Sequence, residues 1–159
     1  MESKSAELAK TAVDLLRSHQ TGVLSTHSLK HPGFPYASVV PYAISGSSSN
    51  SRPLFLMSSM ATHTKNLKAN GSAALLVAPN SIDPLSAGRV TLIGTVTQIE
   101  GAQAEAAKSL YVNAHPQAQQ WANFGDFAMY QLELVDIYIV AGFGNMGWVS
   151  PSDLETQLQ

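Results

Sequence analysis

The sequence predicts a mainly β fold, an antiparallel barrel with a few helices attached. About six segments are either continuously apolar or alternate apolar and polar residues, as strands do. The regular strand–helix alternation that produces a parallel sheet is missing. The strand expected over residues 89–99 is long and carries Gly94 near its middle, which is typical of strands that bend in small closed barrels.

Length and composition narrow the class of protein. The 159 residues suit one domain, taken as residues 1–159. Apolar residues make up 45% and charged residues only 13%, which predicts a surface partly covered by another subunit, and hence a homo-oligomer. The net charge of −2 argues against nucleic acid as a partner, and the absence of cysteine excludes thiolate chemistry and cysteine-ligated metals. Without an apolar signal core or a membrane-length run, the expected location is cytoplasmic, with no membrane partner.

The first half of the chain should hold one helix and three strands. Apolar residues recur at steps of three and four over residues 5–19, which predicts an amphipathic N-terminal helix. Three segments that follow have strand composition: residues 21–26, 36–44 and 54–57. Because proline cannot donate to a strand ladder, Pro41 marks a sheet edge, a bulge or a close approach by another group. The serine-rich residues 45–51 should form a flexible hairpin-type loop.

The second half should add further strands and a second long helix. Strand composition returns in three segments: residues 74–78, 89–99 and 127–140. An alanine-rich helix is expected over 102–112, broken by His115 and Pro116. The glycine-rich residues 141–147 lack the spacing of a dinucleotide-binding loop, and no helix is expected after them. Residues 150–159 are expected to be a loosely held tail.

A binding site is expected in the stretch LFLMSSMATHTKNLKANGSAALL, which starts at Leu54. A short apolar run ends there in two serines, and His63, Thr64 and Lys65 follow within a few residues. No aspartate or glutamate occurs in the stretch. Hydroxyls, a lysine and a helix N-terminus attract anions such as phosphate. The same pattern also occurs as an ordinary helix cap, so both interpretations stay open.

Four segments resemble the FMN-binding split barrels related to pyridoxamine 5′-phosphate oxidase, and most closely their heme-utilisation branch. They are SVVPYAI, LFLMSSMATHTKNL, the RVTLIGTV that follows DPL, and FGDFAMYQLELVDIYIVAGFGNMGWV. In this order they span most of residues 21–149. The resemblance implies a split antiparallel β-barrel with flanking helices. It also implies a homodimer that holds FMN in each of two clefts between the subunits.

The resemblance also implies which residues contact FMN. They are Ser38, Val39 and Val40 along the isoalloxazine ring, Ser58 and Ser59 near the ribityl chain or phosphate, His63, Thr64, Lys65 and Asn66 around the phosphate, Arg89 at the start of the strand facing the flavin, and Trp148 approaching from the partner subunit. Simpler roles stand beside three of these. Arg89 would pair with Asp83 on the surface, Trp148 would be a core or interface aromatic, and His63 would bond locally.

Two departures from the family bear on the reaction. Pyridoxamine phosphate oxidases end in an arginine-bearing segment that grips the substrate phosphate, whereas the last arginine here is Arg89. The heme-utilisation branch uses a C-terminal histidine to meet the iron, whereas no histidine follows His115 here. If heme binds, His27, His31 or His115 would have to be the iron ligand. His27 and His31 are otherwise interpreted as ordinary loop histidines.

Two functions from different classes follow. The first is an FMN-dependent oxidoreductase of unknown substrate, in which the flavin performs the redox chemistry. No acid–base pair stands out, and Tyr36, Tyr42 and Asp126 are the candidates. The second is a non-catalytic flavin- or heme-binding or regulatory dimer on the same barrel, as in Creg-like relatives whose flavin site is blocked. No bulky insertion interrupts the polar turn or the region of Arg89, which favours the enzyme.

Overall fold

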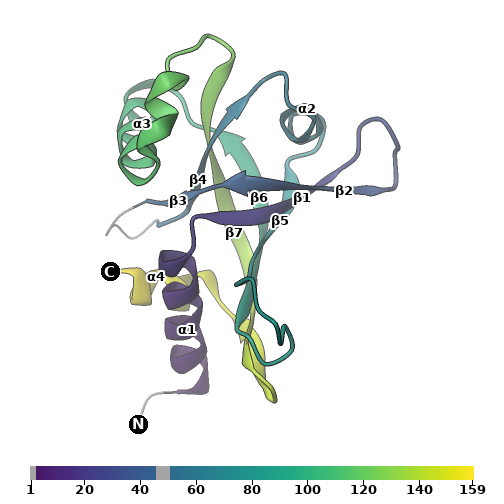
Figure 1. Cartoon of the computed structure of the whole chain (residues 1–159), viewed down its shortest axis with the longest axis vertical. Helices are drawn as coiled ribbons and strands as arrows, with labels where there is room; N and C mark the ends of the chain where they lie inside the picture. The colour runs from purple at the N-terminus through teal and green to yellow at the C-terminus, as the bar shows by residue number, and fades with distance from the viewer. Residues whose placement is uncertain (1–2, 46–50) are drawn as a thin grey trace.

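The computed structural model describes residues 3–45 and 51–159, which fold into a curled antiparallel sheet with helices packed around it (Figure 1). The strands are β1 (Thr21–His27), β2 (Pro35–Pro41), β3 (Ala43–Ile44), β4 (Pro53–Ser58), β5 (Ser72–Val77), β6 (Arg89–Gln98), β7 (Phe127–Gly142) and β8 (Asn145–Val149). The helices are α1 (Lys4–Ser18), α2 (Thr62–Ala69), α3 (Gly101–Ala114), α4 (Pro151–Leu158) and the 3₁₀ turn η1 (Pro116–Gln120). The predicted mainly β, split-barrel architecture is confirmed.

The strand order is β2-β1-β5-β6-β7-β4-β3, with β8 paired to β7. Pro41 lies where one extended segment changes partners, because β2 pairs with β1 whereas Ala43 and Ile44 pair with β4. This confirms Pro41 as a sheet-edge position. Most of the serine-rich loop expected at 45–51 lies outside the described residues.

Gly94 is needed where β6 crosses β7. The register shifts between Ile93 and Gly94, and a Cβ atom built on Gly94 would lie on top of the Glu133 carbonyl oxygen. A side chain there would force the two backbones apart, so the predicted mid-strand bend has a steric cause.

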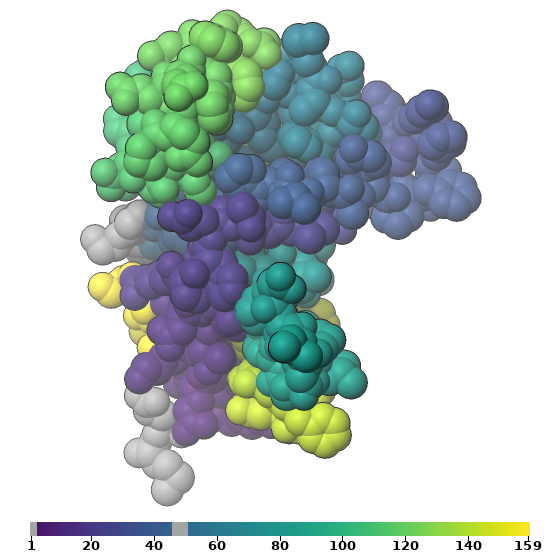
Figure 2. All heavy atoms as spheres, in the orientation of Figure 1, coloured from purple at the N-terminus to yellow at the C-terminus, as the bar shows by residue number. Residues whose placement is uncertain are grey.

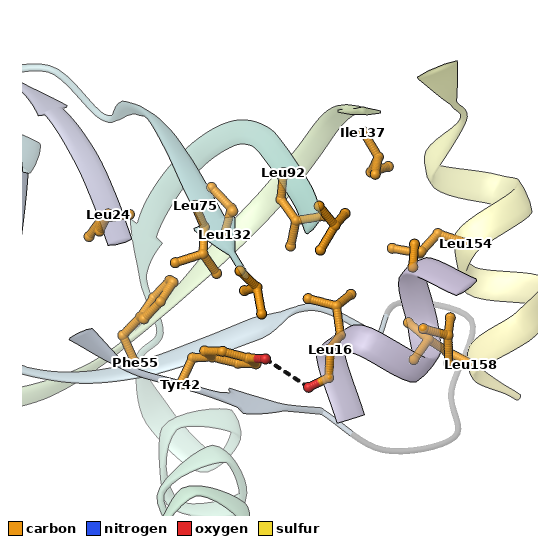
Figure 3. Packing of buried hydrophobic residues seen from close by; sticks show 14 of the residues in the cluster. Leu16, Leu24, Tyr42, Phe55, Leu75, Leu92, Leu132, Ile137, Leu154 and Leu158 are labelled. Atoms are coloured by element: carbon orange, nitrogen blue, oxygen red, sulfur yellow. Dashed lines mark hydrogen bonds between the residues drawn. The ribbon is translucent and has the colours of Figure 1, made fainter. Parts of the chain in front are cut away.

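The core fills the inside of the sheet and continues under α1. Directly paired residues of five strands form a fully buried row: Leu24, Leu75, Leu92, Ile137 and Val149. The Tyr42 ring packs in the same core, and its hydroxyl donates to the Leu16 carbonyl at 2.8 Å (Figure 3). Burial of the Tyr42 phenol raises its pKa, so the hydroxyl stays protonated as a donor. The α1 helix thereby closes one end of the barrel.

The loose C-terminal tail expected over residues 150–159 is wrong. Residues Pro151–Leu158 form α4, capped by the Ser150 hydroxyl, with Leu154 and Leu158 buried. Arg17 of α1 donates to the Leu158 carbonyl at 2.7 Å. Two leucines four residues apart are too few to show a helical stripe in the sequence, yet together they cover the apolar side of α1.

Candidate functional site

Helix α2 begins with an N-terminus that no side chain caps. Its N-cap residue is Ala61, no acidic residue lies in its first turn, and no side-chain hydrogen bond satisfies the cap. The first backbone N–H groups of a helix attract anions, and an alanine cap leaves them for another partner. This feature agrees with the phosphate site suggested by the sequence.

An acidic side chain nevertheless reaches the start of this turn. The Ser58 hydroxyl donates to the Asp126 carboxylate at 2.6 Å, and the Ser59 N–H donates to the Asp126 carbonyl at 2.7 Å. The stretch itself contains no acidic residue, yet Asp126, which is remote in sequence, is adjacent to it in space. A carboxylate beside Ser58 opposes a phosphate on that side of the turn.

Two residues expected to hold phosphate instead face the interior. Asn66 is buried, donates to the Thr26 hydroxyl at 3.0 Å and accepts from the Leu29 N–H at 2.9 Å. It therefore ties α2 to β1 and to the loop that follows it. Thr64 is also fully buried, and its hydroxyl has no hydrogen-bond partner among the described residues. Lys65, between them, is exposed.

His63 is half-buried and contacts Ser38 of β2. The His63 Nδ1 lies 3.1 Å from the Ser38 hydroxyl, and burial lowers the pKa of His63 below its usual value. A neutral imidazole holds a phosphate less strongly than a cation would. The two residues that follow Ser38 point to opposite sides of the sheet, since Val39 is 72% exposed whereas Val40 belongs to the core. Contact of these residues with FMN stays a prediction.

Arg89 and Trp148 lie on a different surface, the outer face of the sheet. Directly paired residues of six strands form its central row: Val39, Val23, Leu76, Thr91, Tyr138 and Trp148. Trp148 is 57% exposed and packs edge-on against Tyr138, with ring centroids 5.0 Å apart. Arg89 donates to the Pro84 carbonyl at 3.0 Å. No ion pair between Arg89 and Asp83 forms within the described chain.

A groove of about 410 Å³ is cut into this outer face, at the end of β1 and the start of β5. Its walls are mainly apolar and include Ala74, Ile93 and Val135, and His27 lies at its rim. His27 ends β1 and shares the outward orientation of Val23 and Ser25. The sequence analysis interpreted His27 as a loop histidine and missed this orientation. The available signal was that His27 continues the every-second-residue pattern of Val23 and Ser25, which is the alternation of a strand.

Most of the remaining candidate groups are buried or already hydrogen-bonded within the chain. His115 is buried, and its Nε2 lies 2.7 Å from the Tyr42 carbonyl, to which it donates. Tyr42 belongs to the core, and Asp126 holds the two serines. Tyr36 is 37% exposed on β2. Of the histidines proposed for heme, His27 thus combines exposure with an adjoining apolar wall.

This architecture defines the fold class of the protein as a split β-barrel. A putative pyridoxamine 5′-phosphate oxidase from Listeria innocua has the same fold, with a TM-score of 0.62 and 16% identity over 82% of this chain and 95% of that one. Campylobacter jejuni ChuZ also shares it, with a TM-score of 0.73 and 16% identity over 86% of this chain and 56% of that one.

Within that class, the chain belongs to the family described as "CREG, beta-barrel", whose model matches residues 3–155. It is 34% identical over 143 residues to the chloroplastic non-canonical heme oxygenase HOZ of Arabidopsis thaliana, covering 89% of this chain and 43% of that protein. A heme-binding protein from Mycobacterium smegmatis gives a TM-score of 0.84 at 27% identity, covering 98% of this chain and 62% of that one. The chain therefore spans less than two thirds of these relatives.

The described helices include none long and apolar enough to cross a bilayer. The cytoplasmic location stays a prediction, and the Arabidopsis relative is a chloroplast protein.

Proposed function

We propose that this chain is a heme-binding protein that holds the flat face of heme against the outer-face groove beside His27, at the interface of a homodimer. The observation that carries the proposal is an apolar groove of about 410 Å³ with an exposed imidazole at its rim. The relatives named as a heme oxygenase and a heme-binding protein support the same ligand.

The residues present fit the chemistry of heme. A porphyrin is a broad apolar plate, which favours binding to side chains such as Ala74, Ile93 and Val135. Histidine is a common axial ligand of heme iron. The bound heme would supply any redox chemistry. One wall of a sheet covers only one side of a plate, so a second subunit is needed to exclude water from the other.

Heme titration of the purified protein, followed through the Soret band, tests the proposal. Wild-type protein should saturate with one heme per chain, and His27→Ala should lower the affinity at least tenfold by removing the iron ligand. His31→Ala is the matched control, since His31 is an exposed histidine in the next loop. Absence of saturable binding, or equal affinity of the His27 and His31 variants, would refute the proposal. Adding a reductant and oxygen to the heme complex then tests for heme degradation.

FMN is the second candidate, with oxidoreductase activity as its consequence. It is favoured by the uncapped N-terminus of α2, with His63 and Lys65 beside it. Lys65→Ala should weaken FMN binding by about 1.5–3 kcal/mol, the range for a hydrogen bond to a charged group. Flavin titration followed by absorbance measures this change, and NAD(P)H-dependent bleaching shows whether a bound flavin turns over. Failure of FMN to bind at saturation would leave heme as the ligand.

A further inference from the structure

A second cleft lies between helix α3 and strands β4 and β7, beside the lobe that α3 and η1 form at one end of the molecule (Figure 2, green). Its volume is about 340 Å³, at the small end of the range for ligand pockets. Strand β7 lines this cleft at Gln131 and the outer-face groove at Val135. No described residue lines both. The α3 cleft is therefore separate from the proposed heme site.

Small side chains on α3 leave this space open. Residues at steps of three and four along the helix form the face that lines the cleft: Gln103, Ala106, Ala107 and Leu110. The floor opposite this face includes Leu54 and Ile99, which are only 3% and 8% exposed. Because an alanine side chain ends at Cβ, the helix face does not fill the space above that floor. An apolar space of this kind suits the carbon body of a small ligand.

The polar groups of the α3 cleft favour a negatively charged head group. Among the described residues that line it, Arg52 carries a positive charge and none is acidic. The side-chain amides of Gln103 and Gln131 add further N–H donors. A guanidinium binds a carboxylate through charge-assisted hydrogen bonds, often two in parallel. The lining thus combines an apolar floor with the side chain best suited to a carboxylate.

A carboxylate of the chain itself already contacts this guanidinium. Arg52 donates to the Glu133 carboxylate at 3.2 Å, and the two side chains are 25% and 48% exposed. Since an ion pair exposed to this degree contributes little to stability, another carboxylate can take the place of Glu133 at small cost. Glu133 also competes with such a ligand, which gives the site a testable sign.

We propose that the α3 cleft binds a small amphipathic carboxylate, with its apolar body on Leu54 and Ile99 and its carboxylate on Arg52. This site goes beyond the proposed heme function and does not depend on it. A neutral molecule of the same shape would keep the apolar contacts and lose the charge-assisted bond to Arg52. The site should therefore prefer the acid to its neutral counterpart.

Octanoate is the probe, and 1-octanol is the neutral counterpart with the same number of carbon atoms. Titration of the purified protein is followed by heteronuclear NMR of the side-chain amides of Gln103 and Gln131, which line the cleft. Both signals should shift saturably with octanoate, and 1-octanol should bind about tenfold more weakly. Arg52→Gln should remove this preference, because the charge-assisted bond is lost.

Three further variants leave Arg52 in place. Ala106→Trp should abolish octanoate binding, because the indole would fill the cleft from the exposed face of α3. Ser109→Trp is the matched control, since Ser109 is exposed on the same helix but lines a different surface hollow. Glu133→Gln should raise the affinity by roughly twofold to fivefold, because it removes the competing carboxylate of an exposed ion pair.

Saturable shifts of both amides together with these four responses would support the inference. It would be overturned by unshifted amides, by equal affinity for the two probes, or by unchanged binding in Arg52→Gln. Equal loss in both tryptophan variants, or weaker binding in Glu133→Gln, would overturn it as well. Octanoate binding in a protein that fails to bind heme would refute the proposed function and leave this site standing, and heme binding without octanoate binding would do the reverse.

Discussion

The replacement Asn66→Ala separates a structural role from a cofactor-binding role for a residue that the sequence placed at the phosphate. Asn66 is 2% exposed and makes two hydrogen bonds, to the Thr26 hydroxyl and from the Leu29 N–H. The bond to Thr26 contributes about 0.5–1.5 kcal/mol, and leaving the buried Leu29 N–H without its acceptor costs about 1–3 kcal/mol. We therefore expect a loss of about 1.5–4.5 kcal/mol in the free energy of unfolding, without any ligand present.

Urea denaturation followed by far-UV circular dichroism measures this loss, at one fixed protein concentration because a dimer's stability depends on it. Lys65→Ala is the control, since Lys65 is the exposed neighbour on the same helix and should change stability by less than about 0.5 kcal/mol. If the two variants were equally stable, Asn66 would not be holding α2 against β1. The structural reasoning about its role would then be refuted, and a role at the ligand would regain support.

Two further changes test other parts of the structure. Gly94→Ala should prevent correct pairing of β6 with β7, because its Cβ atom would overlap the Glu133 carbonyl; soluble protein with a wild-type melting temperature would contradict this. Because burial lowers the pKa of His63, the unfolded state binds more protons below about pH 6.5, and stability should fall as the pH drops through that range. His63→Gln should reduce the difference in melting temperature between pH 7.5 and pH 5.5. An unchanged difference would show that other groups cause the pH dependence.

Much of the fold follows from local patterns in the sequence. Alternation and apolar runs located the long strands, and the steps of three and four located α1, because periodicity reports which face of a segment is buried. Pro41 and Gly94 marked two of the places where strands depart from regular pairing, since proline cannot donate to a ladder and glycine leaves room for a crossing backbone. Helix α4 was missed because two leucines make too short a pattern.

The candidate site was predicted less completely, because its character depends on residues that meet only after folding. The sequence located the polar turn before α2, yet it could not show that Asp126, 68 residues from Ser58, would bond to it. Nor could it show that Asn66 points inward while Lys65 points out, since a short helix exposes one side and buries the other.

What the sequence determined by itself was most of the helices and strands, the class of barrel and the low charge that predicts a partner subunit. Only the tertiary structure decided which side chains share a surface. The curl of the sheet gathers His27, Ile93 and Val135 into one groove. Their proximity is set by strand pairing across the chain, and no local pattern encodes it.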